Sequence, residues 1–320
     1  QSADQLVAEA NKEGSVVWYN TFTDKQIPKM VSAFNKEYPD IKVDAIKLSS
    51  EIVPRVTTEQ RGGKYSVDLI SGSSTDLSAL YSEGALVKYD APDAPQVPGV
   101  SLPSGYRNVV YVKSTVIAWN PAALKKAGLS APTSWEDLTK PEWKGKFNIV
   151  ANSSGVDFYL SLITAVGHDK ALELVKALGK NKPVLGTSHT QVTTQVQAGE
   201  PVATATAYNY LTATLKQQTP ERMDFLNTDP LLTTINPIVI AKNAPHPAAA
   251  KVFINWLMSK NGQQVVVKAS KQASMLDGVG NDPTVWDPTK WKPAFAKADI
   301  TADQYNQYVT EYTKALGYSS

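Results

Sequence analysis

The sequence predicts an α/β fold made of two bodies. Short apolar strands alternate with single amphipathic helices along the chain, which is typical of parallel β-α-β units with right-handed crossovers. Two long runs of β-forming residues, 109–119 and 233–241, bracket the middle of the chain, and strands of such length can cross from one body to another. We therefore expect a discontinuous first lobe, residues 1–115 plus 240–320, and an inserted second lobe, residues 116–239. The simpler alternative is one large α/β domain with long strands.

In the first third of the chain, the spacing of the apolar residues predicts alternating helices and strands. Ile27, Val31 and Phe34 recur at helical spacing until Pro39 ends that helix, whereas residues 41–46 alternate as a strand does. Gly14 marks the end of an earlier helix. The expected strands are 15–19, 41–46 and 67–70, and helices are expected before Gly14 and at 27–38, 52–61 and 73–83.

The middle of the chain repeats this alternation. Asn120 and Pro121 are an N-cap and a first-turn proline, and residues 134–137 resemble a capping box. The expected strands here are 147–150 and 202–206, and the expected helices are 153–166, 169–178, 191–198 and 208–217. Helices at 246–258 and 301–316 then complete the first lobe.

Composition excludes several classes of protein. Lys+Arg total 32 and Asp+Glu total 30, so the net charge of +2 gives no strong field for nucleic acid. The chain has no cysteine, which removes disulfides, zinc–thiolate sites and a cysteine nucleophile. It has three histidines without metal-ligand spacing and none of the common phosphate-loop or hydrolase motifs. We therefore expect a protein that is not an enzyme and has no cofactor.

Hydroxyl-rich segments mark the expected ligand site. In open α/β sheets, ligands bind beyond the carboxyl ends of the strands. Ser73-Ser74 and Ser153-Ser154 each follow an expected strand and open a helix, where free N–H groups bind anions or carbonyl oxygens; plain N-capping is the alternative. Tyrosines and a threonine also follow strands. The candidate ligand contacts are Tyr19, Thr21, Ser73, Ser74, Ser153, Ser154, Tyr208 and Tyr210.

Several phrases of the sequence resemble the bacterial extracellular solute-binding proteins of ABC importers. They are residues 134–146 (SWEDLTKPEWKGK), residues 243–257 (NAPHPAAAKVFINWL), residues 191–203 and residues 67–86. The resemblance covers nearly the whole chain and points to the branch with the ferric-ion-binding proteins and their relatives for phosphonates, thiamine and polyamines.

The resemblance implies a type II periplasmic-binding fold, in which two α/β lobes are joined by two β-type hinge strands. Such a protein closes around a small polar or anionic solute by a hinge motion and delivers it to an ABC permease in the inner membrane. A monomer in the periplasm, with its signal peptide removed and no nucleic-acid partner, is what we expect of this chain.

Three alternatives stay open. Ferric members of the branch carry an adjacent tyrosine pair, and here Asn209 separates Tyr208 from Tyr210. A ferric ion is still a possible transported ligand, because Fe(III) favours phenolate oxygens. A transferase-like enzyme could use the same two-lobed scaffold. A chemosensory adaptor would share the cleft and differ only in its partner.

Overall fold

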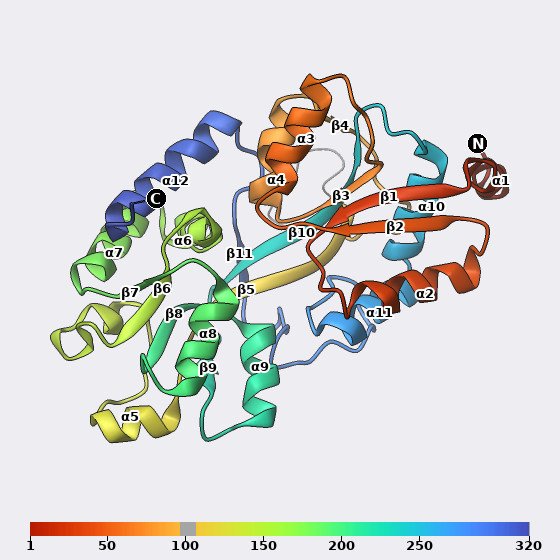
Figure 1. The fold of residues 1–320 in the computed structure, drawn as a ribbon. Coiled ribbons are helices and arrows are strands. Elements are labelled where there is room, and N and C mark those ends of the chain that lie inside the picture. Colours follow the sequence, from red (N-terminus) through yellow and green to blue (C-terminus); the bar gives the residue numbers. More distant parts are fainter. Residues whose placement is uncertain (97–106, 320) are drawn as a thin grey trace. The chain divides into compact units, whose positions relative to one another are not determined.

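The computed structural model describes residues 1–96 and 107–319, which form two compact units. Unit 1 comprises the described residues of Gln1–Val112, Ile235–Asn281 and Ala298–Ala302. Unit 2 comprises those of Lys113–Thr234, Asp282–Lys297 and Asp303–Ser320. Within each unit, helices cover a β-sheet on both faces (Figure 1), so the predicted α/β class is confirmed.

Unit 1 is built on strands in the order β2-β1-β3-β10, and β4 also pairs with β10, at Ile240 and Ala241. Their bounds are β1 Ser15–Asn20, β2 Lys42–Lys47, β3 Leu69–Ser71, β4 Leu86–Val87 and β10 Leu231–Ala241. β1 is parallel to both β2 and β3, whereas β10 is antiparallel to β3 with Ile238 opposite Ser71. The carboxyl ends of β1 and β3 therefore lie at one edge, where the loops with Thr21 and Ser73 begin.

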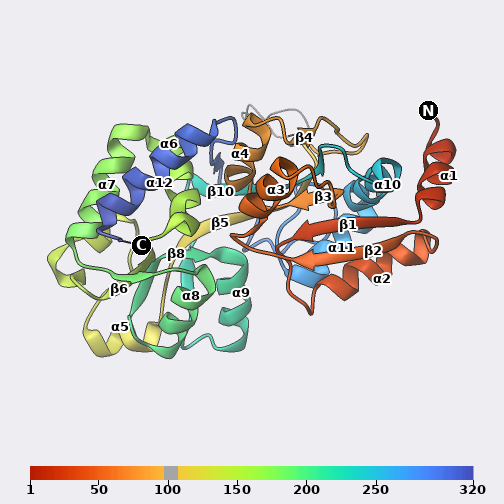
Figure 2. The ribbon, with the colours of Figure 1, turned by 45° about the horizontal axis from the view of Figure 1, so that its top comes forward.

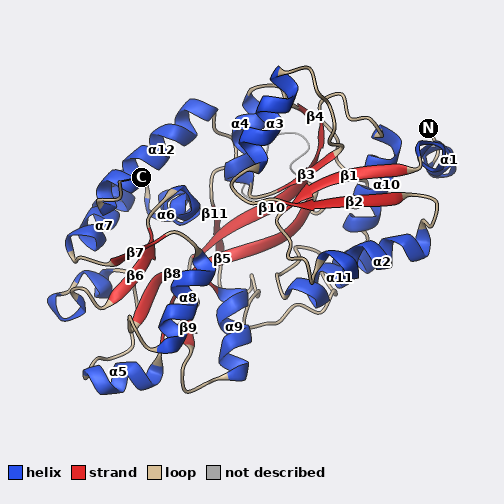
Figure 3. Ribbon diagram, viewed as in Figure 1, coloured by secondary structure: helices blue, strands red, loops and turns tan. Residues whose placement is uncertain are grey.

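Helices pack on the two faces of this sheet with separate cores (Figure 3). They are α1 Ala3–Glu13, α2 Ile27–Glu37, α3 Ile52–Arg61, α4 Ser74–Ser82, α10 Pro247–Met258 and α11 Lys260–Ser270. On one face Trp18 meets Phe253 of α10 with ring centroids 5.1 Å apart, and Phe34 of α2 joins them. On the other face Ile52 of α3 and Leu77 of α4 are buried in one cluster.

A buried carboxylate fastens α10 to the sheet. Asp68 is fully buried and accepts hydrogen bonds from the backbone N–H of Val17 at 2.8 Å and of His246 at 2.6 Å. It also lies 2.9 Å from Nδ1 of His246. Because His246 is the residue before α10, these contacts set where that helix starts. They give His246, within the segment Asn-Ala-Pro-His-Pro, a structural role.

Unit 2 has a sheet with the order β5-β8-β6-β7. Its strands are β5 Val109–Trp119, β6 Phe147–Val150, β7 Val184–Gly186, β8 Ala203–Tyr208, β9 Asp224–Leu226 and β11 Pro293–Phe295. β8 is antiparallel to β5, with Tyr208 opposite Thr115, and parallel to β6. β9 pairs with β5, and β11 pairs with Leu231–Thr233 of β10. The two long extended stretches predicted from the sequence are therefore strands β5 and β10, and each contributes residues to both units.

The helices of unit 2 also divide between two faces. They are α5 Pro121–Ala127, α6 Val156–Val166, α7 His168–Lys180, α8 His189–Ala198, α9 Asn209–Gln218 and α12 Ala302–Leu316, with the 3-10 turns η1 Glu136–Thr139, η2 Pro141–Trp143 and η3 Ser153–Gly155. Residues of α6, α7 and α12 share one core, and Val196 of α8 belongs to another. Figure 2 shows α12 beside α6 and α7.

The C-terminal helix is grouped differently from the expectation, which assigned residues 240–320 to the first lobe. Tyr312 of α12 stacks on Tyr159 of α6 at 5.7 Å and donates a hydrogen bond to the carbonyl oxygen of Val150. Tyr159 and His168 both contact the carboxylate of Glu311. These contacts join α12 to unit 2, although it follows the unit 1 helices α10 and α11 in the chain.

Candidate functional site

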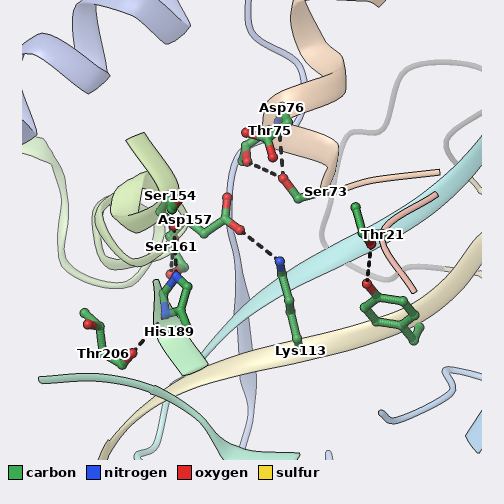
Figure 4. A network of polar contacts seen from close by, with 11 residues as sticks. Thr21, Ser73, Thr75, Asp76, Lys113, Ser154, Asp157, Ser161, His189 and Thr206 are labelled. Carbon is green, nitrogen blue, oxygen red and sulfur yellow. Dashed lines mark hydrogen bonds and ion pairs between the residues drawn. The ribbon is translucent and has the colours of Figure 1, made fainter. Parts of the chain in front are cut away.

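A lysine, an aspartate and a tyrosine from three elements of unit 2 form the centre of the candidate site (Figure 4 shows the lysine and the aspartate). Lys113 and Thr115 share one face of β5, and Tyr208 lies opposite Thr115, so the lysine reaches over the tyrosine ring. Its Nζ lies 4.8 Å from the ring centroid and 3.5 Å from Oδ2 of Asp157 on α6. The side chains of Lys113 and Asp157 are 15% and 6% exposed, so the pair is largely removed from water.

His189, at the start of α8, completes this group. Its ring stacks on Tyr208 with centroids 3.9 Å apart and an angle of 25° between the planes. Nδ1 lies 2.9 Å from the carbonyl oxygen of Thr206, and Nε2 lies 2.9 Å from that of Ser154. Burial lowers the pKa of His189 from its ordinary value, against the opposite effect of the two carbonyls. His189 therefore ties the end of β8 to η3.

The predicted residues Ser153 and Ser154 lie in η3 and are exposed. The structure has a 3-10 turn here, and α6 begins only at Val156, so the predicted helix start at 153 is wrong by one turn. Asn152 caps the turn through a 3.1 Å bond from the N–H of Ser154 to its side-chain oxygen. Gly155 is required, because a Cβ there would lie 2.3 Å from the carbonyl oxygen of Val150.

The two predicted tyrosines of unit 2 lie side by side. The rings of Tyr208 and Tyr210 are 6.0 Å apart at 18°, with Tyr208 buried and Tyr210 partly exposed. Burial raises the pKa of Tyr208 well above its ordinary value, which the nearby Lys113 only partly offsets. The phenol is therefore neutral at physiological pH.

In unit 1 the predicted residues fall into separate small groups. Thr21 Oγ1 lies 3.4 Å from the hydroxyl of Tyr111, and Ser73 Oγ lies 2.9 Å from Oγ1 of Thr75 (Figure 4). Ser73 also caps α4 through the N–H of Asp76 at 3.3 Å. The hydroxyl of Ser74, the first residue of α4, is buried and has no hydrogen-bond partner among the described residues.

Tyr19 is placed away from such polar loops. Its side chain is 1% exposed in the core beneath α3, where its hydroxyl donates to Glu59 at 3.0 Å and Arg55 lies 4.8 Å above its ring. Burial raises the pKa of Tyr19. These partners satisfy the phenol within unit 1. A role of Tyr19 as a ligand contact stays a prediction, as does the meeting of both units' residues at one solute.

The ferric alternative stays a prediction. A ferric ion at Tyr208 would have to displace the phenol proton, because burial raises the pKa of Tyr208, and the ammonium group of Lys113 lies above the ring. Among residues 1–96 and 107–319, there is no group of three or more His, Asp or Glu side chains that could hold a metal ion. Two phenols alone leave most of the coordination sites of Fe(III) without a protein ligand.

Comparison with known proteins identifies the family. Residues 29–296 match the family described as bacterial extracellular solute-binding protein. The chain belongs to this family. It is the solute-binding component of an ABC-type importer, as the sequence predicted.

Two relatives illustrate the range of ligands. The Fe(3+)-binding periplasmic protein of Serratia marcescens is 28% identical over 274 residues, covering 80% of this chain and 77% of that protein. The periplasmic binding protein AfuA of Actinobacillus pleuropneumoniae, solved with exogenous fructose-6-phosphate bound, has a TM-score of 0.81 at 21% identity and covers 96% of this chain and 99% of its own.

A second solved structure agrees in fold. Iron-bound HitA from Pseudomonas aeruginosa has a TM-score of 0.75 at 20% identity, covering 94% of this chain and 99% of that chain. The predicted type II periplasmic-binding fold is therefore confirmed. None of the helices described here is both long and apolar enough to cross a membrane.

The sequence interpretation missed three residues of the candidate site. Lys113, Asp157 and His189 come from three elements that are distant in the sequence, so no local motif joins them. One signal was available: a lysine within the apolar run of β5 is costly to bury without a partner, and Lys113 is the one lysine in residues 109–119.

Proposed function

We propose that this solute-binding protein captures a small anionic solute bearing a phosphate or carboxylate group, with unit 2 supplying the charge-selecting contacts. The observation that carries the proposal is the position of Lys113, a largely buried ammonium group that lies over the Tyr208 ring and pairs with Asp157, three residues after the exposed Ser154 of η3. A cation held in a low-dielectric setting attracts anions and repels cations more strongly than one in water. The sugar phosphate bound by AfuA is a solute of this kind.

A thermal-shift panel, followed by calorimetry of any hit, tests the charge of the solute. A ligand that binds only the folded chain raises the melting temperature. The panel contains fructose 6-phosphate, citrate and inorganic phosphate as anions, with fructose as the neutral control and spermidine as the cationic one. We expect a shift with at least one anion and none with spermidine or fructose; a shift with spermidine alone contradicts the proposal.

Substitution of the lysine localises the charge selection. Lys113→Gln removes the ammonium group and should weaken anion binding by about tenfold or more, because a hydrogen bond to a charged group contributes about 1.5–3 kcal/mol. Lys216→Gln, which removes an exposed lysine from α9 that pairs with Asp224 at 2.8 Å, is the matched control and should bind as the wild type does.

Iron is tested by colour. A ferric ion bound by phenolates gives a visible charge-transfer band. We expect the protein to stay colourless after incubation with Fe(III) citrate and removal of the excess. A visible band that disappears in Tyr208→Phe would establish the ferric alternative and overturn the anion proposal.

We further propose that the chain releases its solute unchanged. Both ring nitrogens of His189 face backbone carbonyls, and the carboxylate of Asp157 pairs with Lys113. Neither group is presented to a solute as a general base. Incubation with the bound anion followed by mass spectrometry tests this, and turnover would favour an enzyme.

The partner, location and assembly follow the family. We propose that the chain works as a monomer in the periplasm after removal of a signal peptide, and that it delivers solute to an ABC permease in the inner membrane. Size-exclusion chromatography with light scattering measures whether the chain is a monomer. Fractionation of expressing cells measures whether it lies in the periplasm.

A further inference from the structure

The His189 ring has acceptors on both sides. Its Nδ1 and Nε2 each lie 2.9 Å from a backbone carbonyl oxygen, of Thr206 and Ser154 respectively. A neutral imidazole carries one N–H and one lone pair, so it can donate to only one of these oxygens. At the other nitrogen, a lone pair would face a carbonyl oxygen. Only the imidazolium form satisfies both contacts.

The surroundings of the ring act on its charge in opposite directions. The ring is 8% exposed. Tyr208 of β8, whose pKa burial raises, stacks on it, with Tyr210 of α9 beyond that ring. Burial disfavours the imidazolium most strongly and lowers the pKa of His189, and Lys113 of β5 acts in the same direction. The two backbone carbonyls and Asp157 of α6 favour the imidazolium. β6 and β7, which also pack against α8, have no titratable side chain.

The two carbonyls belong to the candidate site itself. Thr206 lies two residues before Tyr208 on β8, and Ser154 is in η3. Loss of one ring proton removes one of these bonds and replaces it with a repulsive contact. The link between η3 and the end of β8 is then broken on one side of the ring.

We propose that His189 is a positioning residue whose imidazolium form holds η3 against the end of β8, so that solute affinity is linked to the uptake of a proton. The link between protonation and solute affinity rests on the proposed function, because it assumes that the solute binds at the turn η3 with Ser153 and Ser154. The arrangement with both contacts binds the ring proton more tightly than one that has lost a contact. Solute affinity therefore rises as the pH falls through the His189 titration.

Nuclear magnetic resonance of the solute-free protein tests the ring directly. With ¹⁵N-labelled histidine, the signals of His189 are assigned by their loss in His189→Gln. Because burial lowers the pKa of His189, we expect both ring nitrogens to be protonated at about pH 4.5 and one of them to become unprotonated at higher pH. A ring that keeps one unprotonated nitrogen from pH 4.5 to 8, or one that never titrates, overturns the proposal. This readout needs no solute.

A second measurement connects the ring to η3. The backbone amide of Gly155, which follows the Ser154 carbonyl, should titrate with the same midpoint as the His189 ring. The titration should persist in His168→Gln, a matched control on α7 in which the exposed histidine beside Glu311 is replaced. It should vanish in His189→Gln, whose fold is checked by near-ultraviolet circular dichroism. A Gly155 titration that is unchanged in His189→Gln contradicts the positioning role.

Calorimetry with fructose 6-phosphate then tests the link to affinity. Because burial lowers the pKa of His189, we expect the affinity ratio of wild type to His189→Gln to rise by about fivefold between pH 6.5 and 4.5; the titration of the phosphate itself cancels in this ratio. An unchanged ratio overturns the linkage. Failure of both proteins to bind any anion would count against the proposed function instead, and the ring and amide titrations would still decide the role of His189.

Discussion

Gly155 gives the sharpest prediction about the site, because the space around its Cα is already filled. A Cβ at this position would lie 2.3 Å from the carbonyl oxygen of Val150 and 2.7 Å from the hydroxyl of Tyr312. The backbone, with φ −86° and ψ −5°, is one that alanine adopts without strain. Any cost of Gly155→Ala is therefore steric.

The magnitude follows from the size of the overlap. Carbon and oxygen atoms in contact are separated by about 3.3 Å, so η3 or its neighbours must move by roughly 1 Å. Overpacking of this kind costs about 1–3 kcal/mol. The move also disturbs the 2.5 Å hydrogen bond from Tyr312 to Val150, which adds about 1 kcal/mol. We expect Gly155→Ala to lower the free energy of unfolding by about 2–4 kcal/mol.

Urea unfolding measures this loss, and two further variants isolate its cause. Gly62→Ala, where the nearest atom to a Cβ is 3.4 Å away and φ is −80°, should change stability little. Tyr312→Phe combined with Gly155→Ala should cost less than the sum of the two changes, because the hydroxyl that clashes is gone. A Gly155→Ala protein within about 0.5 kcal/mol of wild type would refute the steric argument.

Two other changes test the rest of the fold. Asp68→Asn should cost about 2–4 kcal/mol in urea unfolding, because the amide cannot accept all three hydrogen bonds that the buried carboxylate receives; exposed Asp4→Asn is its control, and equal costs would show that Asp68 is no anchor. Glu311 raises the pKa of His168, so the pair stabilises unit 2 below the unfolded pKa of about 6.5 and this contribution is lost as the pH rises through the higher folded pKa. Because the His168 side chain is 43% exposed, the pair contributes little to stability. The difference between the melting temperatures at pH 5.5 and pH 9 should be larger in wild type than in His168→Gln. Equal differences in the two proteins would contradict a stabilising role of the pair.

Local pattern predicted most of the individual elements. The apolar and β-branched residues of 109–119 and 233–241 identified β5 and β10, because such residues suit a strand buried on both faces. Helix α11 was not predicted. Its consecutive valines, Val265–Val267, favour a strand by propensity, and the Ser259 N-cap and packing against α2 outweigh that preference.

Long-range contacts are what the sequence pattern could not supply. The place of α12 depends on Tyr312 meeting Val150 and on Gly179 of α7 lying against Ala315, where a Cβ would be 2.4 Å from the carbonyl oxygen. The hydroxyls of η3 were found because they follow a strand directly. Lys113, Asp157 and His189 were not, because their meeting depends on the β5–β8 register and on the packing of α6 and α8.

The path of the chain through unit 2 has a consequence for its synthesis. Residues 282–297 and α12 belong to this unit, and Tyr312 bonds to the strand end that precedes η3. A nascent polypeptide cannot finish this half of the protein until α12 has left the ribosome. Until then the apolar residues of α6 and α7 that pack against α12 stay exposed to water.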